Sequence, residues 1–143
     1  MGQPAAATPL LLALERVVVA SVGRTAKVLA EVAPELTLVQ WRVLVVVDDP
    51  DGVPVSQVAS SLGAKLSAVS RLLGRLRDHG LVATRRDETD ARVIRVSLTP
   101  KGRALRDRIV ARRRASLAEA VARIDAAPGT EAALRQLAGV LAE

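Results

Sequence analysis

Apolar residues recur at helical spacing over most of this chain. Between Leu10 and Val32 they fall three or four positions apart, which predicts one long helix. Leu12 and Val19 lie off the main apolar stripe, and a helix that is apolar on two sides usually packs in two directions. We therefore expect this helix to contact a partner chain as well as its own core.

A second helix is predicted after a proline-containing break. Thr37 and Gln40 have the spacing of a capping box, and Leu36 and Trp41 occupy the staple positions around it. The helix should end near Asp48, where the sequence DDPDGVP is typical of a turn. The run LVVV is also compatible with a buried strand, but the capping box favours a helix.

Two shorter helices follow, joined by a turn that contains glycine. The first is expected over residues 54–62, with Gly63 as its stop, and the second from about Leu66 to Gly80. Two such helices form a helix-turn-helix. The positions expected to face inward are Val55, Val58, Ala59 and Leu62 in the first helix and Leu66, Val69, Leu72, Leu73 and Leu76 in the second.

A β-hairpin with a charged tip is predicted next. Residues 82–84 and 93–98 are rich in β-branched side chains, and the connecting sequence RRDETDAR is apolar only at Ala91. Such a tip is either a solvated loop or a finger that touches a charged partner. A hairpin directly after a helix-turn-helix makes a winged helix, in which Arg86 and Arg92 could enter a narrow, negative minor groove. Asp90 is expected to hold Arg92 in position.

The remaining chain predicts two more helices. Thr99 is a plausible N-cap with Pro100 at the first helical position, and helical spacing continues to about Ile124. The sequence APGT breaks the pattern, and a last helix starts at Thr130.

Composition excludes several classes of function. The chain has no cysteine and one histidine, which excludes disulfides and thiol chemistry and removes most metal and Ser-His sites. No set of nucleophile and base and no glycine-rich phosphate loop is present, so we expect no enzyme, no metal and no cofactor. No apolar run reaches transmembrane length, and the start MGQPAAATP lacks the basic region of a secretory signal. We therefore expect a cytoplasmic protein with no membrane partner.

Positive charge is concentrated in the second half of the chain. The formal net charge is +6; residues 54–98 carry 8 basic and 4 acidic side chains, and residues 99–125 carry 8 and 3. Such a patch attracts polyanions, with double-stranded DNA the leading candidate, although a solvated surface is the alternative. Ser67, Ser70, Arg71 and Arg75 fall on the predicted outer face of the second short helix. Arginine and serine suit base edges and phosphates, although the face is also compatible with an ordinary solvated helix.

Two motifs resemble the MarR (multiple antibiotic resistance regulator) family of winged helix-turn-helix transcription regulators. They are LGxxxSxVSRLLxRLxxxGLV and RRDxxDxRxxxVxLTxKG, and the resemblance spans about Leu36 to Leu105. It implies a mainly α fold with a small β-hairpin and a homodimer that grips a pseudo-palindromic operator. The implied parts are an N-terminal dimerisation helix (1–33), a winged lobe (34–99) and C-terminal dimerisation helices (100–143).

The resemblance also implies which residues meet DNA. Ser67, Ser70 and Arg71 would meet the major groove, Arg75 and Arg77 the backbone, and Asp90 with Arg92 would belong to the wing. The full predicted DNA-binding set is Lys65, Ser67, Ala68, Ser70, Arg71, Arg75, Arg77, Arg86, Asp90 and Arg92.

The resemblance further implies repression that a small hydrophobic or aromatic effector can relieve. Geometry alone predicts a pocket at Val18 of the first helix and Trp41 and Val45 of the second, and each of these residues is also compatible with ordinary core. The alternative function is a winged-helix module that binds protein, but such modules usually lack arginines on the recognition face and wing.

Three departures from the family pattern matter. Ala91 stands where the family commonly has the first arginine of DRR, which puts one DNA contact in doubt. Lys65 replaces a serine cap, a loss that typically costs about 1 kcal/mol but could be recovered through a phosphate contact. The absence of cysteine excludes the peroxide-sensing branch of the family.

Overall fold

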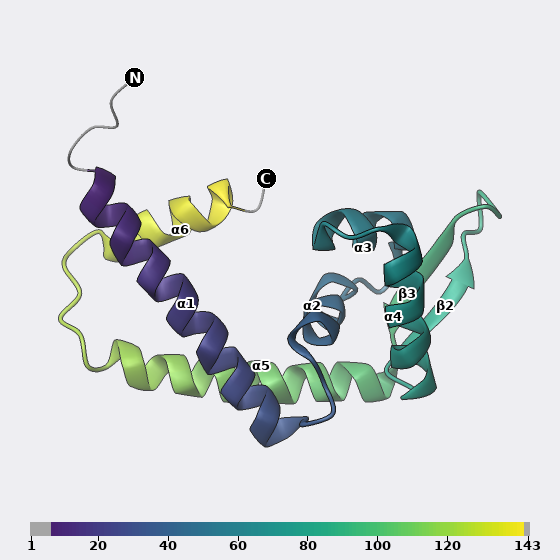
Figure 1. Ribbon diagram of the computed structural model, residues 1–143, viewed down its shortest axis with the longest axis horizontal. Coiled ribbons are helices and arrows are strands. Elements are labelled where there is room, and N and C mark those ends of the chain that lie inside the picture. The colour runs from purple at the N-terminus through teal and green to yellow at the C-terminus, as the bar shows by residue number, and fades with distance from the viewer. Residues whose placement is uncertain (1–6, 142–143) are drawn as a thin grey trace. The chain divides into compact units, whose positions relative to one another are not determined.

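The computed structural model describes residues 7–141, with side chains from Pro9 onward. The predicted absence of a secretory signal rests mainly on residues 1–6, outside the described range. The elements are α1 (Ala7–Val32), α2 (Leu38–Val46), β1 (Val53–Pro54), α3 (Val55–Leu62), α4 (Leu66–Asp78), β2 (Val82–Arg86), β3 (Ile94–Leu98), α5 (Pro100–Val121) and α6 (Thr130–Val140) (Figure 1). The predicted mainly helical class is confirmed. Within the described residues, no helix has the length and apolarity needed to cross a membrane.

The chain divides into two compact units. The first extends through Arg113 and contains α1, the winged lobe and most of α5, and the second begins at Arg114 and contains the end of α5 and α6. In the second unit, the α6 side chains Leu134 and Val140 are 58% and 61% exposed. The predicted divisions after residues 33 and 99 stay predictions.

Local sequence signals fix the ends of the helices in the lobe. At the start of α2, Thr37 Oγ1 accepts a hydrogen bond from the Gln40 N–H at 3.2 Å, and Gln40 Oε1 accepts one from the Thr37 N–H at 2.9 Å. The predicted capping box is therefore confirmed. Gly63 ends α3 in the left-handed conformation, with φ of 60°, which glycine adopts without strain.

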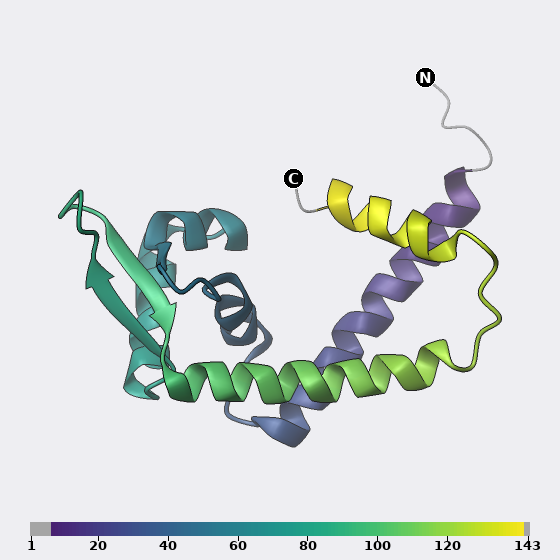
Figure 2. The ribbon, with the colours of Figure 1, turned by 180° about the vertical axis from the view of Figure 1, so that it is seen from behind.

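The sheet has three strands rather than the two of a hairpin. β3 lies between β1 and β2, and both pairings are antiparallel, with Val53 opposite Val96 and Val82 opposite Leu98. The strand β1 was not predicted, because two residues are too few to show alternation and Pro54 favours a helix start. β2 also runs to Arg86, two residues further than predicted. Seen from behind, the hairpin tip projects beyond α3 and α4 (Figure 2).

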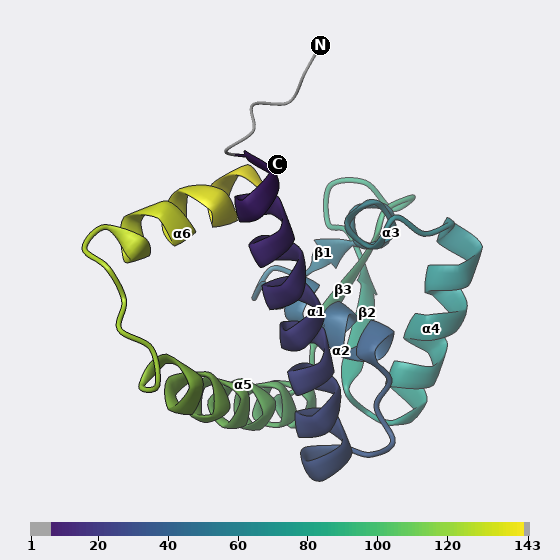
Figure 3. The same ribbon diagram turned by 60° about the vertical axis from the view of Figure 1, so that its left-hand side comes forward.

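One apolar core, mostly of aliphatic side chains, joins the elements of the first unit. The C-terminal half of α1 covers it with Val28 and Leu29, while Val17 and Val19 in the same helix are 62% and 72% exposed. The apolar side chains in the N-terminal half of this helix are thus left exposed, and its predicted packing against a partner chain stays a prediction. α3 and α4 flank the sheet (Figure 3). Most of the inward-facing predictions also hold, but Leu66 is 55% exposed, because it lies in the first turn of α4.

The start of α5 is fixed tightly to the end of α4. Thr99 Oγ1 accepts from the Gly102 N–H at 3.0 Å, which confirms Thr99 as the N-cap, and also donates to the Gly80 carbonyl at 2.6 Å. A Cβ atom at Gly102 would lie 1.9 Å from the Leu81 carbonyl oxygen, so only glycine fits there. Arg106 of α5 binds both carboxylate oxygens of Asp48, at 2.6 Å each, which holds α5 against the turn after α2.

Candidate nucleic-acid interface

All ten residues predicted to bind DNA are exposed. Seven belong to α4 or its N-cap, and Arg86, Asp90 and Arg92 belong to the wing. Val69, Leu73 and Leu76 bury the opposite face of α4 in the core. The fold therefore presents the predicted polar face of α4 to solvent, where a groove of DNA could accept it.

The arginines on α4 have no side-chain partners in the part of the chain that the structure describes. Among the described residues, no hydrogen bond or ion pair involves the side chains of Arg71, Arg75 or Arg77, although acidic residues occur nearby in sequence. A guanidinium group has five N–H donors and a permanent charge, so these three side chains are open to phosphate oxygens or to the acceptors of guanine.

The first turn of α4 has a different chemistry. Lys65 is the N-cap and its side chain makes no capping hydrogen bond, as expected from the missing serine. Ser70 Oγ donates to the Leu66 carbonyl at 2.9 Å, so its hydroxyl proton is used within the helix. In this rotamer Ser70 offers a partner only its acceptor lone pairs.

Asp87 organises the wing. Its Oδ1 accepts hydrogen bonds from the Thr89 N–H at 2.9 Å, the Thr89 hydroxyl at 2.6 Å and the Asp90 N–H at 3.1 Å, while Oδ2 binds Arg95 Nε. The bonds from Thr89, then Arg95, then the backbone hold the pKa of the Asp87 carboxyl well below its usual range. The same ion pair raises the pKa of Arg95.

The role expected for Asp90 holds only for the backbone. Asp90 Oδ1 accepts from the backbone N–H of Arg92 at 2.9 Å, whereas no bond joins the carboxylate to the Arg92 guanidinium within the described residues. Asp90 therefore shapes the turn and leaves the Arg92 side chain free. Arg86 donates only a long bond, 3.5 Å, to the Ala91 carbonyl, so its guanidinium is also largely available.

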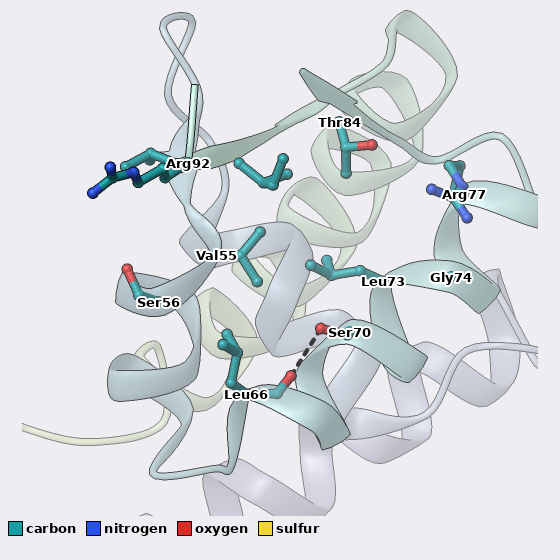
Figure 4. A pocket seen from close by; sticks show the side chains of 11 residues that line it. Val55, Ser56, Leu66, Ser70, Leu73, Gly74, Arg77, Thr84 and Arg92 are labelled. Carbon is teal, nitrogen blue, oxygen red and sulfur yellow. Dashed lines mark hydrogen bonds between the residues drawn. The ribbon is translucent and has the colours of Figure 1, made fainter. Parts of the chain in front are cut away.

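A cavity of about 480 Å³ separates α4 from the wing. Leu66, Leu73 and Val55 form its apolar floor, and Ser70 and Arg77 line it from α4 (Figure 4). Arg92 lies at its outer edge, with the guanidinium pointing away from the interior (Figure 4). The helix α4, which we call the recognition helix, and the wing thus form two walls of this cavity, and the arginines lie at its rim.

The structure does not assemble the predicted effector pocket within this chain. Trp41 is 6% exposed and belongs to the core, whereas Val18 and Val45 are each 48% exposed. None of the cavities described is lined by these three residues. They stay a prediction. Within residues 7–141, no group of three or more His, Asp or Glu side chains is arranged to hold a metal ion.

Sequence reasoning missed the residues that anchor the wing. Arg95 Nη1 donates to the Gly52 carbonyl at 2.8 Å and Arg85 Nη2 to the Asp51 carbonyl at 2.7 Å, so both arginines face the protein. The spacing of Asp87 and Thr89 is that of an Asx turn, a signal that could have identified Asp87 as structural. The partner Arg95 has no comparable local signal, because its contact to Gly52 spans 43 positions.

Comparisons with known proteins agree with this arrangement. A profile described as MarR family matches residues 35–93, which include the helix-turn-helix and most of the wing. The HTH-type transcriptional regulator TtmR of Methylorubrum extorquens is 36% identical over 75 residues, covering 52% of this chain and 38% of that protein. The HTH-type transcriptional repressor IacR of Pseudomonas putida is 31% identical over 68 residues, covering 48% of this chain and 41% of that protein.

The match to these two relatives thus covers about two fifths of their length. A crystal structure of RV1404 from Mycobacterium tuberculosis is similar over nearly the whole chain, with a TM-score of 0.83, 26% identity, and coverage of 99% of this chain and 97% of that one. The winged lobe is thus similar to the MarR family, and the fold match extends this similarity in structure to the flanking helices.

Proposed function

We propose that the protein is a sequence-specific DNA-binding transcriptional regulator and not an enzyme. The observation that carries the proposal is the exposed face of α4, where Arg71, Arg75 and Arg77 have no partner among the described residues. In the proposed complex α4 enters the major groove, where arginine can read guanine. Arg92 on the wing approaches the adjacent minor groove, whose narrow, negative surface attracts arginine.

The active form is a homodimer on a pseudo-palindromic operator. Support comes from the apolar side chains that α1 and α6 each leave exposed, Val17 and Val19 in the first and Leu134 and Val140 in the second. Exposed apolar surface of this extent usually marks an interface with another chain. A two-fold dimer would present two α4 helices to half-sites about one helical turn apart.

Repression and release by a small effector complete the proposal. The similarity to IacR, described as a repressor, supports the direction of control. An effector bound near Val18, Trp41 and Val45 would have to bind the DNA-free state more tightly, since only a difference in affinity shifts the equilibrium. Such a regulator acts in the cytoplasm, where its DNA lies.

Fluorescence anisotropy tests the proposed function. The purified protein is titrated into a labelled duplex from around its own gene and into a scrambled duplex, each at two salt concentrations. We expect tighter binding to the genomic duplex, two chains per site, and a steep loss of affinity with salt from released counterions. Equal binding to both duplexes with no salt dependence would contradict the proposal and favour a module that binds protein.

A further inference from the structure

A second groove runs along α4, on the side away from the wing. It has a volume of about 590 Å³ and is lined by Arg71 and Arg75 of α4, by Ala68 and Leu62, and by Val39 and Arg42 of α2. The cavity next to the wing uses a different set of α4 residues, including Ser70 and Arg77. The recognition helix therefore lies between two hollows, and each has arginines on its walls.

Arg42 is held in place at this groove. Its Nη2 donates to the Ser61 carbonyl at 3.0 Å, in the last turn of α3, while the side chain remains exposed. This bond uses one of five guanidinium donors and fixes the direction of the group. A pre-oriented guanidinium loses less conformational entropy on binding than a free one does.

The charge of the groove is uncompensated. None of its lining residues is acidic, and within residues 7–141 neither Arg42 nor Arg71 nor Arg75 forms an ion pair. Three guanidinium groups around a hollow without a carboxylate match an anion that follows the length of α4. A helix that enters the major groove has a phosphate backbone on each side, and DNA is thus the occupant that fits.

We propose that Arg42 of α2 binds a DNA phosphate on the strand that borders α4 opposite the wing. The inference rests on the proposed function and adds a residue outside the helix-turn-helix and wing. Arg71 and Arg75 lie on the same groove, so the contact makes α2 part of the interface. In this role Arg42 contributes affinity and register rather than choice of base, because phosphates carry no sequence information.

The matched control for Arg42 is Arg108. This exposed arginine also donates its Nη2 to the carbonyl of another helix, Val32 at the end of α1, over 3.2 Å, but it lies on α5 and lines neither groove beside α4. Arg42→Gln and Arg108→Gln each remove one positive charge and one bond to a carbonyl. The full-length variants are compared with the wild type by anisotropy on the same duplex at several salt concentrations, together with thermal unfolding.

We expect Arg42→Gln alone to weaken binding and to make the salt dependence shallower. Each neutralised phosphate contributes about 0.9 to the slope of log K against log salt, and the dimer variant loses two such contacts, one per half-site. The ratio of wild-type to variant affinity should therefore shrink about 12-fold over a fourfold rise in salt. Arg42→Lys keeps the charge and should restore the slope. A wild-type slope in Arg42→Gln, or an equal loss in Arg108→Gln, would overturn the inference.

Neutral phosphates give a second readout that does not depend on stability. The duplex is prepared with single methylphosphonate substitutions across the site. At one position per half-site, neutralisation should weaken wild-type binding and leave Arg42→Gln unaffected. If every position weakens both proteins alike, Arg42 does not touch a phosphate. If the wild type itself binds DNA without salt dependence, the proposed function fails rather than this contact alone.

Discussion

Asp87 and Arg95 face each other within the wing, and the Arg95 guanidinium links the Asp87 carboxylate to the Gly52 carbonyl. The bridge joins the tip of the hairpin to the turn before β1. The charged residues of the wing thus fall into two groups: some hold the wing against the protein, and others are open to a binding partner. Arg85 and Arg95 bind backbone carbonyls of the preceding turn, whereas Arg92 forms no side-chain bond within the described residues.

Replacing Asp87 with Asn should loosen the wing without unfolding the lobe. The Asn side chain has nearly the same shape as Asp but lacks the negative charge, which strengthens the hydrogen bonds that the carboxylate accepts from Thr89, Asp90 and Arg95. We expect faster hydrogen exchange at the Thr89 and Asp90 amides and weaker DNA binding, because the wing must then be ordered on binding. Glu88→Gln is the control, since it removes a charge from the same loop at a side chain that is 89% exposed and makes only a surface ion pair with Arg85 at 3.5 Å. Equal exchange in both variants would show that Asp87 does not order the turn.

The wing should withstand mild acid. The bonds to Asp87 lower the pKa of its carboxyl below the value of about 3.9 expected in the unfolded chain. Because the pKa of Asp87 is lower in the folded state than in the unfolded state, its ionised carboxylate stabilises the fold at pH values above the unfolded-state pKa. This stabilisation is lost as the pH falls through the folded-state pKa. The carboxyl carbon signal of Asp87 in NMR should therefore titrate well below pH 4. A midpoint near 3.9 would mean that the hydrogen bonds are not formed in solution.

Gly102→Ala should destabilise the protein more than a typical helix substitution. The new Cβ would meet the Leu81 backbone oxygen at 1.9 Å, and backbone cannot move aside as a flexible side chain can. Overpacking typically costs about 1–3 kcal/mol, and this contact belongs at the upper end. Gly74→Ala is the control, because a Cβ there meets nothing within 4 Å and alanine favours a helix by about 0.5–1 kcal/mol. Chemical unfolding of both variants measures the difference.

The sequence predicted the elements that have strong local signals. The capping box at Thr37, the stop at Gly63 and the N-cap at Thr99 each depend on residues within a few positions of each other. The strand β1 could not be predicted, because it exists only through pairing with β3, more than 40 positions away. The exposure of Leu66 was not predicted, because helical spacing shows which face of a helix is apolar but not which turns of that face are covered by the core.

The residues of the candidate site also divide into those that local sequence predicts and those that only the tertiary fold brings together. The exposed face of α4 follows from its helical period, which predicted Arg71 and Arg75 directly, whereas Arg77 was predicted only through the family resemblance. Arg42 belongs to another helix and reaches the groove beside α4 only through the fold. The sequence also could not show that Arg95 binds Asp87 and Gly52 within the protein whereas the Arg92 side chain is open to a partner, because both residues carry the same charge.

Trp41→Ala should destabilise the protein strongly, because Trp41 is buried in the core. Trp41 is 6% exposed and belongs to the core cluster, and truncation of a buried tryptophan costs about 3–5 kcal/mol. Val45→Ala, at a half-exposed position of the same helix, should cost about 1 kcal/mol or less. Urea unfolding followed by circular dichroism compares the two. A small loss for Trp41→Ala would free this residue for an effector pocket.

Arg71 and Arg92 should differ in what they contribute to DNA recognition. Arg71 lies on the exposed face of α4 without a partner among the described residues, and a bidentate contact to guanine would make Arg71→Ala cost about 1–3 kcal/mol on the operator. The loss should be much smaller on a scrambled duplex. Arg92→Ala should weaken binding to both duplexes alike and reduce the salt slope of the dimer by about 1.8, about 0.9 for each wing, since a wing arginine meets charge rather than base edges. Competition binding with the two duplexes measures both effects. Operator binding by Arg71→Ala that equals the wild type would mean that another face of α4 reads the bases.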